Sequence, residues 1–248
     1  NVHGCRAGGR RMSSTTAAVP ARRRRSQRGS GEQLRAEIVA AAKQLLASAS
    51  SVDDVSIRAV ADAVGVTPPS IYLHFSDKTE LVAAVVADVF AELDAAMLEA
   101  GARAEGPMGR LRAYGMAYVR FAVSHPEHYR IAAMDPCPTP DVDEVLASGA
   151  FVHFNATVVE CIEAGIFADG DPLPITLDLW TAAHGIASLQ IAKPFLPWGD
   201  FDAAAERMLC AAALGHAAAG LVGEPTTPAR VTEWLRRRRG RRSPDLAR

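Results

Sequence analysis

The stretch Ser56–Phe75, S-I-R-A-V-A-D-A-V-G-V-T-P-P-S-I-Y-L-H-F, contains two short helical patterns joined at a glycine. Its opening serine is a residue type favoured as an N-cap, and the apolar residues after it recur on one helix face. Gly65 can adopt the left-handed conformation that ends a helix at little cost. Thr67 is placed to cap a second helix, whose first turn tolerates two prolines because N–H groups there have no partner inside the helix.

A helix–glycine–helix corner is a common way to present one helix to the major groove of DNA, although it also occurs in all-α proteins of other function. Ile71 and Phe75 lie four residues apart, so we expect them to anchor the second helix on the first. That helix has no Arg, Lys, Asn or Gln for bidentate contacts with bases. Recognition of the DNA sequence is therefore expected to depend on the hydroxyls of Thr67 and Ser70, on apolar contact of the prolines with thymine methyl groups, and on DNA shape.

The run from Leu34 to about Val89 resembles the N-terminal domain of the TetR family of bacterial transcription regulators. The resemblance rests on the helix 33–47, on S-I-R-A-V-A-D-A-V-G-V, on T-P-P-S-I-Y-L-H-F and on S-D-K-T-E-L-V. It implies a homodimer that binds operator DNA through this domain. It also implies release of the operator, as by a repressor, when the C-terminal domain binds a small-molecule effector.

The same resemblance implies that Tyr72, His74 and Lys78 contact phosphates, which fix the position of a protein on DNA rather than its sequence preference. Tyr72 and His74 fit a packing role in the small domain as well. Arg58 is a further candidate for a phosphate contact. The predicted DNA-binding residues are Ser56, Arg58, Thr67, Pro68, Pro69, Ser70, Tyr72, His74 and Lys78.

The composition favours an all-α protein, because hydrophobic residues make up 49%, alanine is abundant and alternating β-branched runs are scarce. Residues 1–28 hold eight arginines and no acid, and residues 230–248 hold eight arginines against two acids. The segment between them holds 11 basic and 26 acidic residues, a net charge of −15. Since an acidic body repels DNA, local basic groups must supply the attraction.

Four domains or segments are predicted: a disordered arm over 1–30, a helix-turn-helix DNA-binding domain over 31–78, a helical ligand-binding and dimerisation domain over 79–223, and an Arg-rich tail over 224–248. The block Arg22–Arg25 fits either a minor-groove contact or a solvated tail, whereas the C-terminal run is expected to be an unstructured, solvated tail. Met12 is a candidate start, with residues 1–11 an upstream remnant. Asp77 and Glu80 have capping-box spacing at the start of the helix that should join the domains.

The C-terminal domain is expected to contain helices over 107–123, 141–167, 176–192 and 201–222, with a rigid loop over 135–140. The segment 208–223 is apolar on all sides, which predicts a buried helix too short to span a bilayer. We interpret it, with the Trp180 helix, as a four-helix dimer interface; a core helix of the monomer is the alternative. Trp180, His184 and Gly185 resemble the Trp–His–Gly subgroup of the TetR family.

Aromatic and sulfur-containing side chains on several helices are candidates for an effector pocket, although each also fits a plain core role. Such pockets are mostly apolar with a few polar groups, so a small hydrophobic molecule is expected. The predicted ligand-binding residues are Tyr114, Tyr118, Phe121, Met134, Phe154, Trp180 and His184.

Catalysis, metal binding and cofactors are not predicted. His125 and His128 are separated by a proline and no third metal ligand follows, and there is no phosphate loop or nucleophile elbow. The four cysteines show neither metal-ligand spacing nor a disulfide framework, which favours a reducing cytoplasm. The alternative function is a helical small-molecule carrier or adaptor without specific DNA binding.

Overall fold

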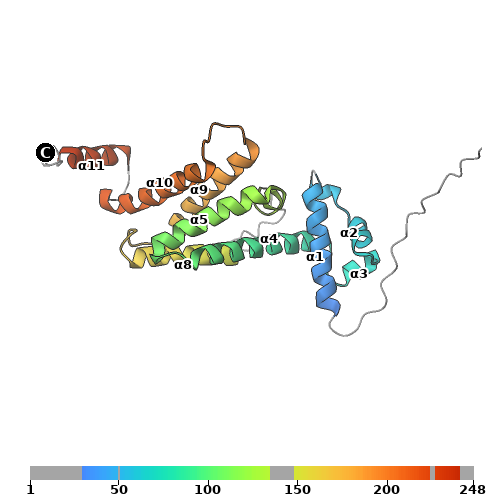
Figure 1. Cartoon of the computed structure of the whole chain (residues 1–248). Helices are drawn as coiled ribbons and strands as arrows, with labels where there is room; N and C mark the ends of the chain where they lie inside the picture. The colour runs from blue at the N-terminus through green and yellow to red at the C-terminus, as the bar shows by residue number, and fades with distance from the viewer. Residues whose placement is uncertain (1–29, 50, 135–147, 224–226, 241–248) are drawn as a thin grey trace, which may run out of the picture.

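The computed structural model describes residues 30–49, 51–134, 148–223 and 227–240, and every element within these ranges is helical, which confirms the all-α prediction (Figure 1). The elements are α1 (Ser30–Ser48), the 3₁₀ turn η1 (Val52–Asp54), α2 (Ile57–Val64), α3 (Pro68–Tyr72), α4 (Lys78–Gly101), α5 (Gly106–Ser124), α6 (Pro126–Tyr129), the π-helical turn η2 (Arg130–Met134), α8 (Gly149–Glu163), α9 (Pro172–Ala192), α10 (Phe201–Val222) and α11 (Pro228–Gly240).

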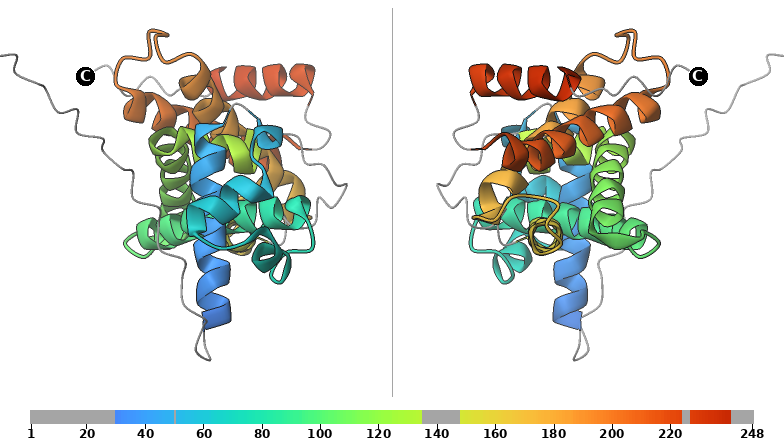
Figure 2. Two further views of the ribbon diagram at one scale, coloured as in Figure 1. Left: turned by 90° about the vertical axis from the view of Figure 1, so that its right-hand side faces the viewer. Right: turned by 90° about the vertical axis from the view of Figure 1, so that its left-hand side faces the viewer.

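The helices form two groups that α4 connects. Helices α1, α2 and α3 gather at one end of the molecule, and α4 runs from there along a bundle that contains α5, α8, α9 and α10 (Figure 1). Figure 2 looks along the molecule from both ends, with α2 and α3 nearest the viewer in its left panel. The short helix α11 lies at the end of the molecule opposite to α2 and α3 (Figure 1).

The first group packs around its own hydrophobic core, to which helices outside the group also contribute. From α1 to α3 and the residues after it, the buried members are Ile38, Val39, Ala42, Leu46, Val55, Val60, Ala61, Ile71 and Phe75. Leu81 and Val85 of α4 and Ile131 of η2 complete this core. Further along α4, Phe90, Leu93 and Met97 belong instead to the core of the bundle. As expected, α4 is thus a structural part of both groups.

The predicted helix boundaries around the two short helices are confirmed. The Ser56 hydroxyl accepts a hydrogen bond from the Ala59 N–H at 3.1 Å, and Gly65 has a φ of 77° at the end of α2. Asp77 caps α4 by accepting from the Glu80 N–H at 2.9 Å. The capping box is displaced by one residue, because the Glu80 carboxylate accepts from the Ser76 N–H rather than from that of Asp77.

The apolar helix α10, which is predicted to be buried in a dimer interface, is only partly covered within the single chain. Its buried residues are the small side chains Ala204, Ala205 and Ala213, whereas Leu214 is 66% exposed and Leu221 is 63% exposed. An apolar composition on all sides indicates that a helix is covered, but it does not indicate whether the cover comes from the same chain. The interpretation as a monomer core helix is therefore disfavoured.

The expectation of an unstructured C-terminal tail is also wrong, since Pro228–Gly240 forms the helix α11. The Thr227 hydroxyl accepts from the Arg230 N–H at 3.4 Å, and the Arg238 guanidinium lies 5.0 Å from the centre of the Trp234 ring. The predicted arm over 1–30, apart from its last residue, and the predicted loop over 135–140 lie outside the described residues. Within the described ranges, no helix has the length and apolarity to cross a membrane.

Candidate DNA-binding surface and ligand cavity

Helix α3 is the candidate recognition helix, and its orientation is set by two buried side chains. Ile71 and Phe75 are almost fully buried against the core of the first group. Residues that are not part of this apolar face therefore point away from the core. Thr67 occupies the N-cap position, but its hydroxyl makes no capping hydrogen bond and lies 3.0 Å from the Ser70 hydroxyl instead.

Directly after α3, at its C-cap position, lies an exposed residue that is absent from the predicted DNA-binding set. Leu73 is 84% exposed, and the neighbouring Tyr72 is 54% exposed. Leu73 follows the buried Ile71 by two residues and Pro69 by four, so it shares a helix face with Pro69 on the side opposite Ile71. The helical spacing within T-P-P-S-I-Y-L-H-F indicates this placement, because Ile71 and Phe75 occupy the inner face.

Basic side chains from three elements lie around this surface, together with acidic groups of η1, α2 and the start of α4. The Lys78 ammonium lies 3.6 Å from the carboxylate of Asp53, which is in η1 and fully accessible. Arg58 is exposed on α2, and the Arg35 guanidinium lies 4.9 Å from the centre of the Phe75 ring. The Ser56 hydroxyl is already engaged as the cap of α2. His74 is half-buried, and Pro68 and Ser70 are likewise partly exposed.

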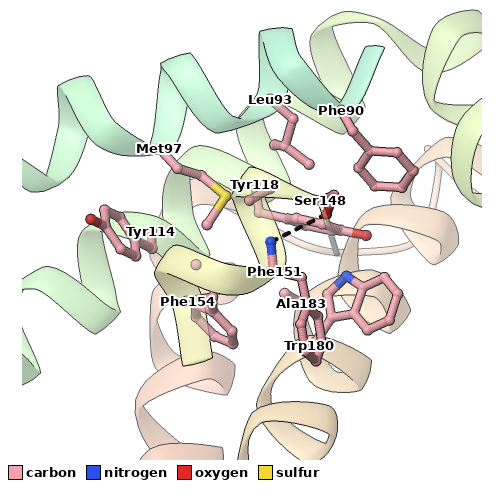
Figure 3. Close-up of a pocket in the computed structure, with 12 residues that line it drawn as sticks. Phe90, Leu93, Met97, Tyr114, Tyr118, Ser148, Phe151, Phe154, Trp180 and Ala183 are labelled. Atoms are coloured by element: carbon pink, nitrogen blue, oxygen red, sulfur yellow. Dashed lines mark hydrogen bonds between the residues drawn. The ribbon is translucent and has the colours of Figure 1, made fainter. Parts of the chain in front are cut away.

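The bundle contains a cavity between α4, α5, α8 and α9. The cavity is narrow: the space between its side chains is about 390 Å³ when the part open to solvent is included, and about 20 Å³ of it has room for the centre of a water molecule. Figure 3 shows aromatic rings and Met97 surrounding this space, with the Tyr114 hydroxyl directed away from its centre. The lining residues are Phe90, Leu93, Met97, Tyr114, Gly115, Tyr118, Ser148, Ala150, Phe151, Phe154, Trp180 and Ala183. No acidic or basic side chain is among these lining residues.

The cavity brings together four of the seven predicted ligand-binding residues: Tyr114, Tyr118, Phe154 and Trp180. Phe121 packs at the edge of the bundle core, its ring centre 4.9 Å from that of His125. Met134 is exposed at the end of η2. The α4 residues that line the cavity were not predicted, because they continue the same apolar stripe that forms the core.

His184 lies next to the cavity lining rather than in it. Its Nδ1 atom is 2.5 Å from the Tyr129 hydroxyl and 3.4 Å from the Tyr118 hydroxyl, and the two hydroxyls are 3.0 Å apart. Burial lowers the pKa of His184, which favours a neutral imidazole. Burial also raises the pKa of both tyrosines, so the hydroxyls keep their protons and can donate. Tyr118 therefore connects the cavity to a buried hydrogen-bond network.

Residues 129–131 link this network to the first group of helices. While Tyr129 contacts His184, the adjacent Arg130 guanidinium donates to the backbone carbonyls of Leu46 at 3.3 Å and Ala49 at 3.1 Å. These carbonyls lie at the C-terminal end of α1, where helix carbonyls lack partners within the helix. The next residue, Ile131, is buried in the core of the first group.

Lys43 provides a second link between α1 and α4. Its ammonium lies 2.5 Å from an oxygen of Asp88 and 2.7 Å from an oxygen of Glu92. Although burial opposes the charge, the hydrogen bonds to the two carboxylates raise the pKa of Lys43. The helix α4, which carries cavity residues, is thus held directly to α1, which packs against α2.

The two histidines considered as metal ligands lie close together in the described part of the chain. His125 and His128 stack with their ring centres 6.1 Å apart. Within the described ranges, no three His, Cys, Asp or Glu side chains are arranged to hold a metal ion.

A helix-turn-helix with an exposed second helix, joined to a helical bundle that contains a cavity, defines a class of DNA-binding transcription regulators. Residues 38–85 match the family model described as bacterial regulatory proteins of the tetR family, and residues 111–232 match a tetracyclin repressor-like C-terminal domain. The chain belongs to the TetR family of transcription regulators. The Trp–His–Gly subgroup stays a prediction.

Solved structures share this fold. A protein of unknown function from Rhodococcus sp. RHA1 is 27% identical, with a TM-score of 0.63 over 74% of this chain and 95% of that chain. A TetR family transcription regulator from Marinobacter aquaeolei VT8 is 17% identical, with a TM-score of 0.59 over 75% of this chain and 98% of that chain. RolR, solved in complex with resorcinol, is 20% identical, with a TM-score of 0.56 over 77% of this chain and 96% of that chain. A comparison with curated proteins gives no match.

Proposed function

We propose that the protein is a homodimeric repressor that binds operator DNA through α3 and leaves it when a small apolar molecule occupies the cavity. The observation that carries this proposal is the direct connection between cavity and recognition surface. Helix α4 lines the cavity and completes the core beneath α3, while Tyr129, Arg130 and Ile131 contact the network, α1 and that core in turn. Displacement of either link by a ligand changes how α3 is held.

The proposed effector class follows from the chemistry of the cavity. The described lining residues are largely aromatic and aliphatic and include no charged side chain, so an ionised ligand would lose its hydration without gaining a counter-charge from them. RolR, which shares the fold, has been solved with the small aromatic molecule resorcinol. Both points support an uncharged aromatic compound of modest size as the effector.

The proposed dimer uses the exposed apolar faces of α9 and α10. These adjacent helices expose leucines that a single chain leaves in solvent, and Gly185 and Gly215 have open space where a side chain would stand. The exposed large residues are Leu173, Leu177 and Leu189 on α9 and Met208, Leu214 and Leu221 on α10. Burying them against a second copy would build a four-helix interface and position two recognition helices for successive major grooves.

The experiment uses the purified full chain. Genomic fragments bound by the protein are selected, and binding of the best fragment is followed by fluorescence anisotropy while uncharged aromatic compounds are added. We expect a dimer by sedimentation at micromolar concentration, one specific site, and release by compounds that also raise the melting temperature. Only nonspecific, salt-sensitive association with DNA would contradict the proposal and favour the carrier alternative.

A variant that fills the cavity sharpens this experiment. Ala183 is buried in the lining, so Ala183→Leu should occupy ligand space, keep operator binding and abolish release. The matched control is Ala95→Leu, at an exposed position of the cavity-lining helix α4 and outside the proposed dimer interface, which should bind and release as the parent does. Normal release from Ala183→Leu would show that the effector binds elsewhere.

A further inference from the structure

The outermost part of the recognition surface is apolar. Ile71 and Phe75 turn inward, and Pro69 and Leu73, four residues apart, lie on the opposite face. Leu73 leaves 84% of its surface in solvent although it sits in a well-packed small domain. A leucine held outward on the face expected to meet DNA differs from the polar side chains that usually contact base edges.

The polar groups nearby are partly committed to one another. The hydroxyls of Thr67 and Ser70 are 3.0 Å apart, so one of the two protons is used between them. The segment 67–75 has no Arg, Lys, Asn or Gln, the residues that make bidentate contacts with guanine or adenine. Tyr72 and His74 stand on either side of Leu73 in the sequence and are predicted to contact phosphates. Recognition of bases by a donor and acceptor pattern therefore has few side chains to rely on.

Only one base edge in the major groove offers an apolar group, which is the C5-methyl of thymine. Against any other base edge, Leu73 would cover polar atoms without pairing them, which is unfavourable. We propose that this regulator distinguishes its operator by apolar contact of Leu73 and Pro69 with thymine methyl groups. The proposal rests on the proposed operator binding and adds to it the base that the helix selects and the residue that selects it.

The test removes the thymine methyl groups and leaves base pairing unchanged. Duplexes bound by the full chain are selected from a random library, and the best duplex is then amplified with dUTP in place of dTTP. We expect affinity to fall about fourfold for each methyl group that no longer packs on the protein, hence by roughly tenfold or more for a dimer on two half-sites. A random duplex should bind equally with thymine or uracil, because nonspecific binding depends on phosphates.

The protein variant that completes the test is Leu73→Ala. Its melting temperature should be unchanged, because the side chain is exposed, but its preference for thymine over uracil should fall toward one. Leu98→Ala, at an exposed leucine of α4, is the matched control and should keep the full preference. An indirect effect of uracil on DNA shape is also distinguished, since such an effect would persist in Leu73→Ala.

The outcomes separate the two proposals. Selection of a specific duplex that binds equally well with uracil overturns methyl recognition but leaves the regulator intact. Full thymine preference in Leu73→Ala overturns the assignment to Leu73. Failure to select any specific duplex overturns the proposed function itself.

Discussion

Replacing Tyr129 by phenylalanine removes one oxygen atom from the network beside the cavity and leaves the ring in place. The Tyr129 side chain is buried, and its hydroxyl lies 2.5 Å from Nδ1 of His184 and 3.0 Å from the Tyr118 hydroxyl. Because burial lowers the pKa of His184, the neutral imidazole can accept a hydrogen bond at Nδ1 from this hydroxyl. The substitution therefore leaves a partly buried nitrogen without its closest donor.

The free-energy cost follows from that unpaired nitrogen. Leaving a buried acceptor unpaired costs about 1–3 kcal/mol. The Tyr118 hydroxyl is only 3.4 Å from the same nitrogen and can turn toward it, so we expect a value in the lower half of that range. A destabilisation of about 1–2 kcal/mol should lower the melting temperature of a chain of this size by roughly 2–8 °C.

Urea unfolding followed by circular dichroism measures this destabilisation, with Tyr118→Phe and the double variant completing a double-mutant cycle. Because the two hydroxyls share one acceptor, we expect the costs to be non-additive by at least about 0.5 kcal/mol. A Tyr129→Phe protein as stable as the parent, with additive behaviour in the cycle, would refute the assignment of a shared buried network.

Four further results are expected. Lys78→Ala should weaken binding equally on operator and random DNA and reduce the slope of log affinity against log salt by about one unit; an unchanged slope would remove Lys78 from the phosphate contacts. Gly101→Ala should cost about 1–3 kcal/mol, because its methyl would overlap the Tyr114 ring, and adding Tyr114→Ala should remove the overlap; denaturation shows both. The folded-state pKa of His184 lies below its ordinary value of 6.5, so protonation favours the unfolded chain and stability falls as pH drops through 6.5 and below; melting curves of His184→Gln should show a weaker fall. Burial raises the pKa of the Cys161 thiol to about 11, so mass spectrometry should find Cys161 unalkylated by iodoacetamide at pH 8 unless the chain is unfolded.

The helix-turn-helix was predictable because its signals are local. Ser56, Gly65 and Asp77 act within their own turns of helix, and the structure places each at the expected boundary. The predicted DNA-binding set lacks Leu73, although the spacing that turns Ile71 and Phe75 inward also turns Leu73 outward; an exposed leucine is not a usual contact for base edges, which are mostly polar. Assigning residues to the inner and outer faces of this short helix thus identifies an exposed residue that the family pattern does not.

The cavity and the two terminal helices show what local signals do not contain. The cavity residues of α4 continue the apolar stripe that forms the hydrophobic core: Phe90, Leu93 and Met97. The sequence therefore does not indicate which apolar residues line a cavity and which are closely packed. For α10, composition indicates a partner surface without identifying it. The sequence of α11 contains one indication of a helix within its arginine-rich run. Glu233 and Arg237 are four residues apart, a spacing that favours a helix, and they form an ion pair at 2.8 Å.

The shared core beneath α3 limits how freely this regulator can be recombined. Leu81, Val85 and Ile131 come from outside the predicted DNA-binding domain, yet they close its hydrophobic interior. A chimaera that grafts residues 30–78 onto an unrelated sensor would arrive with that interior open on one side. To exchange operator preference between family members, the residues that close this core must therefore be transferred together with the DNA-binding helices. New combinations of sensor and operator are subject to the same steric condition during evolution.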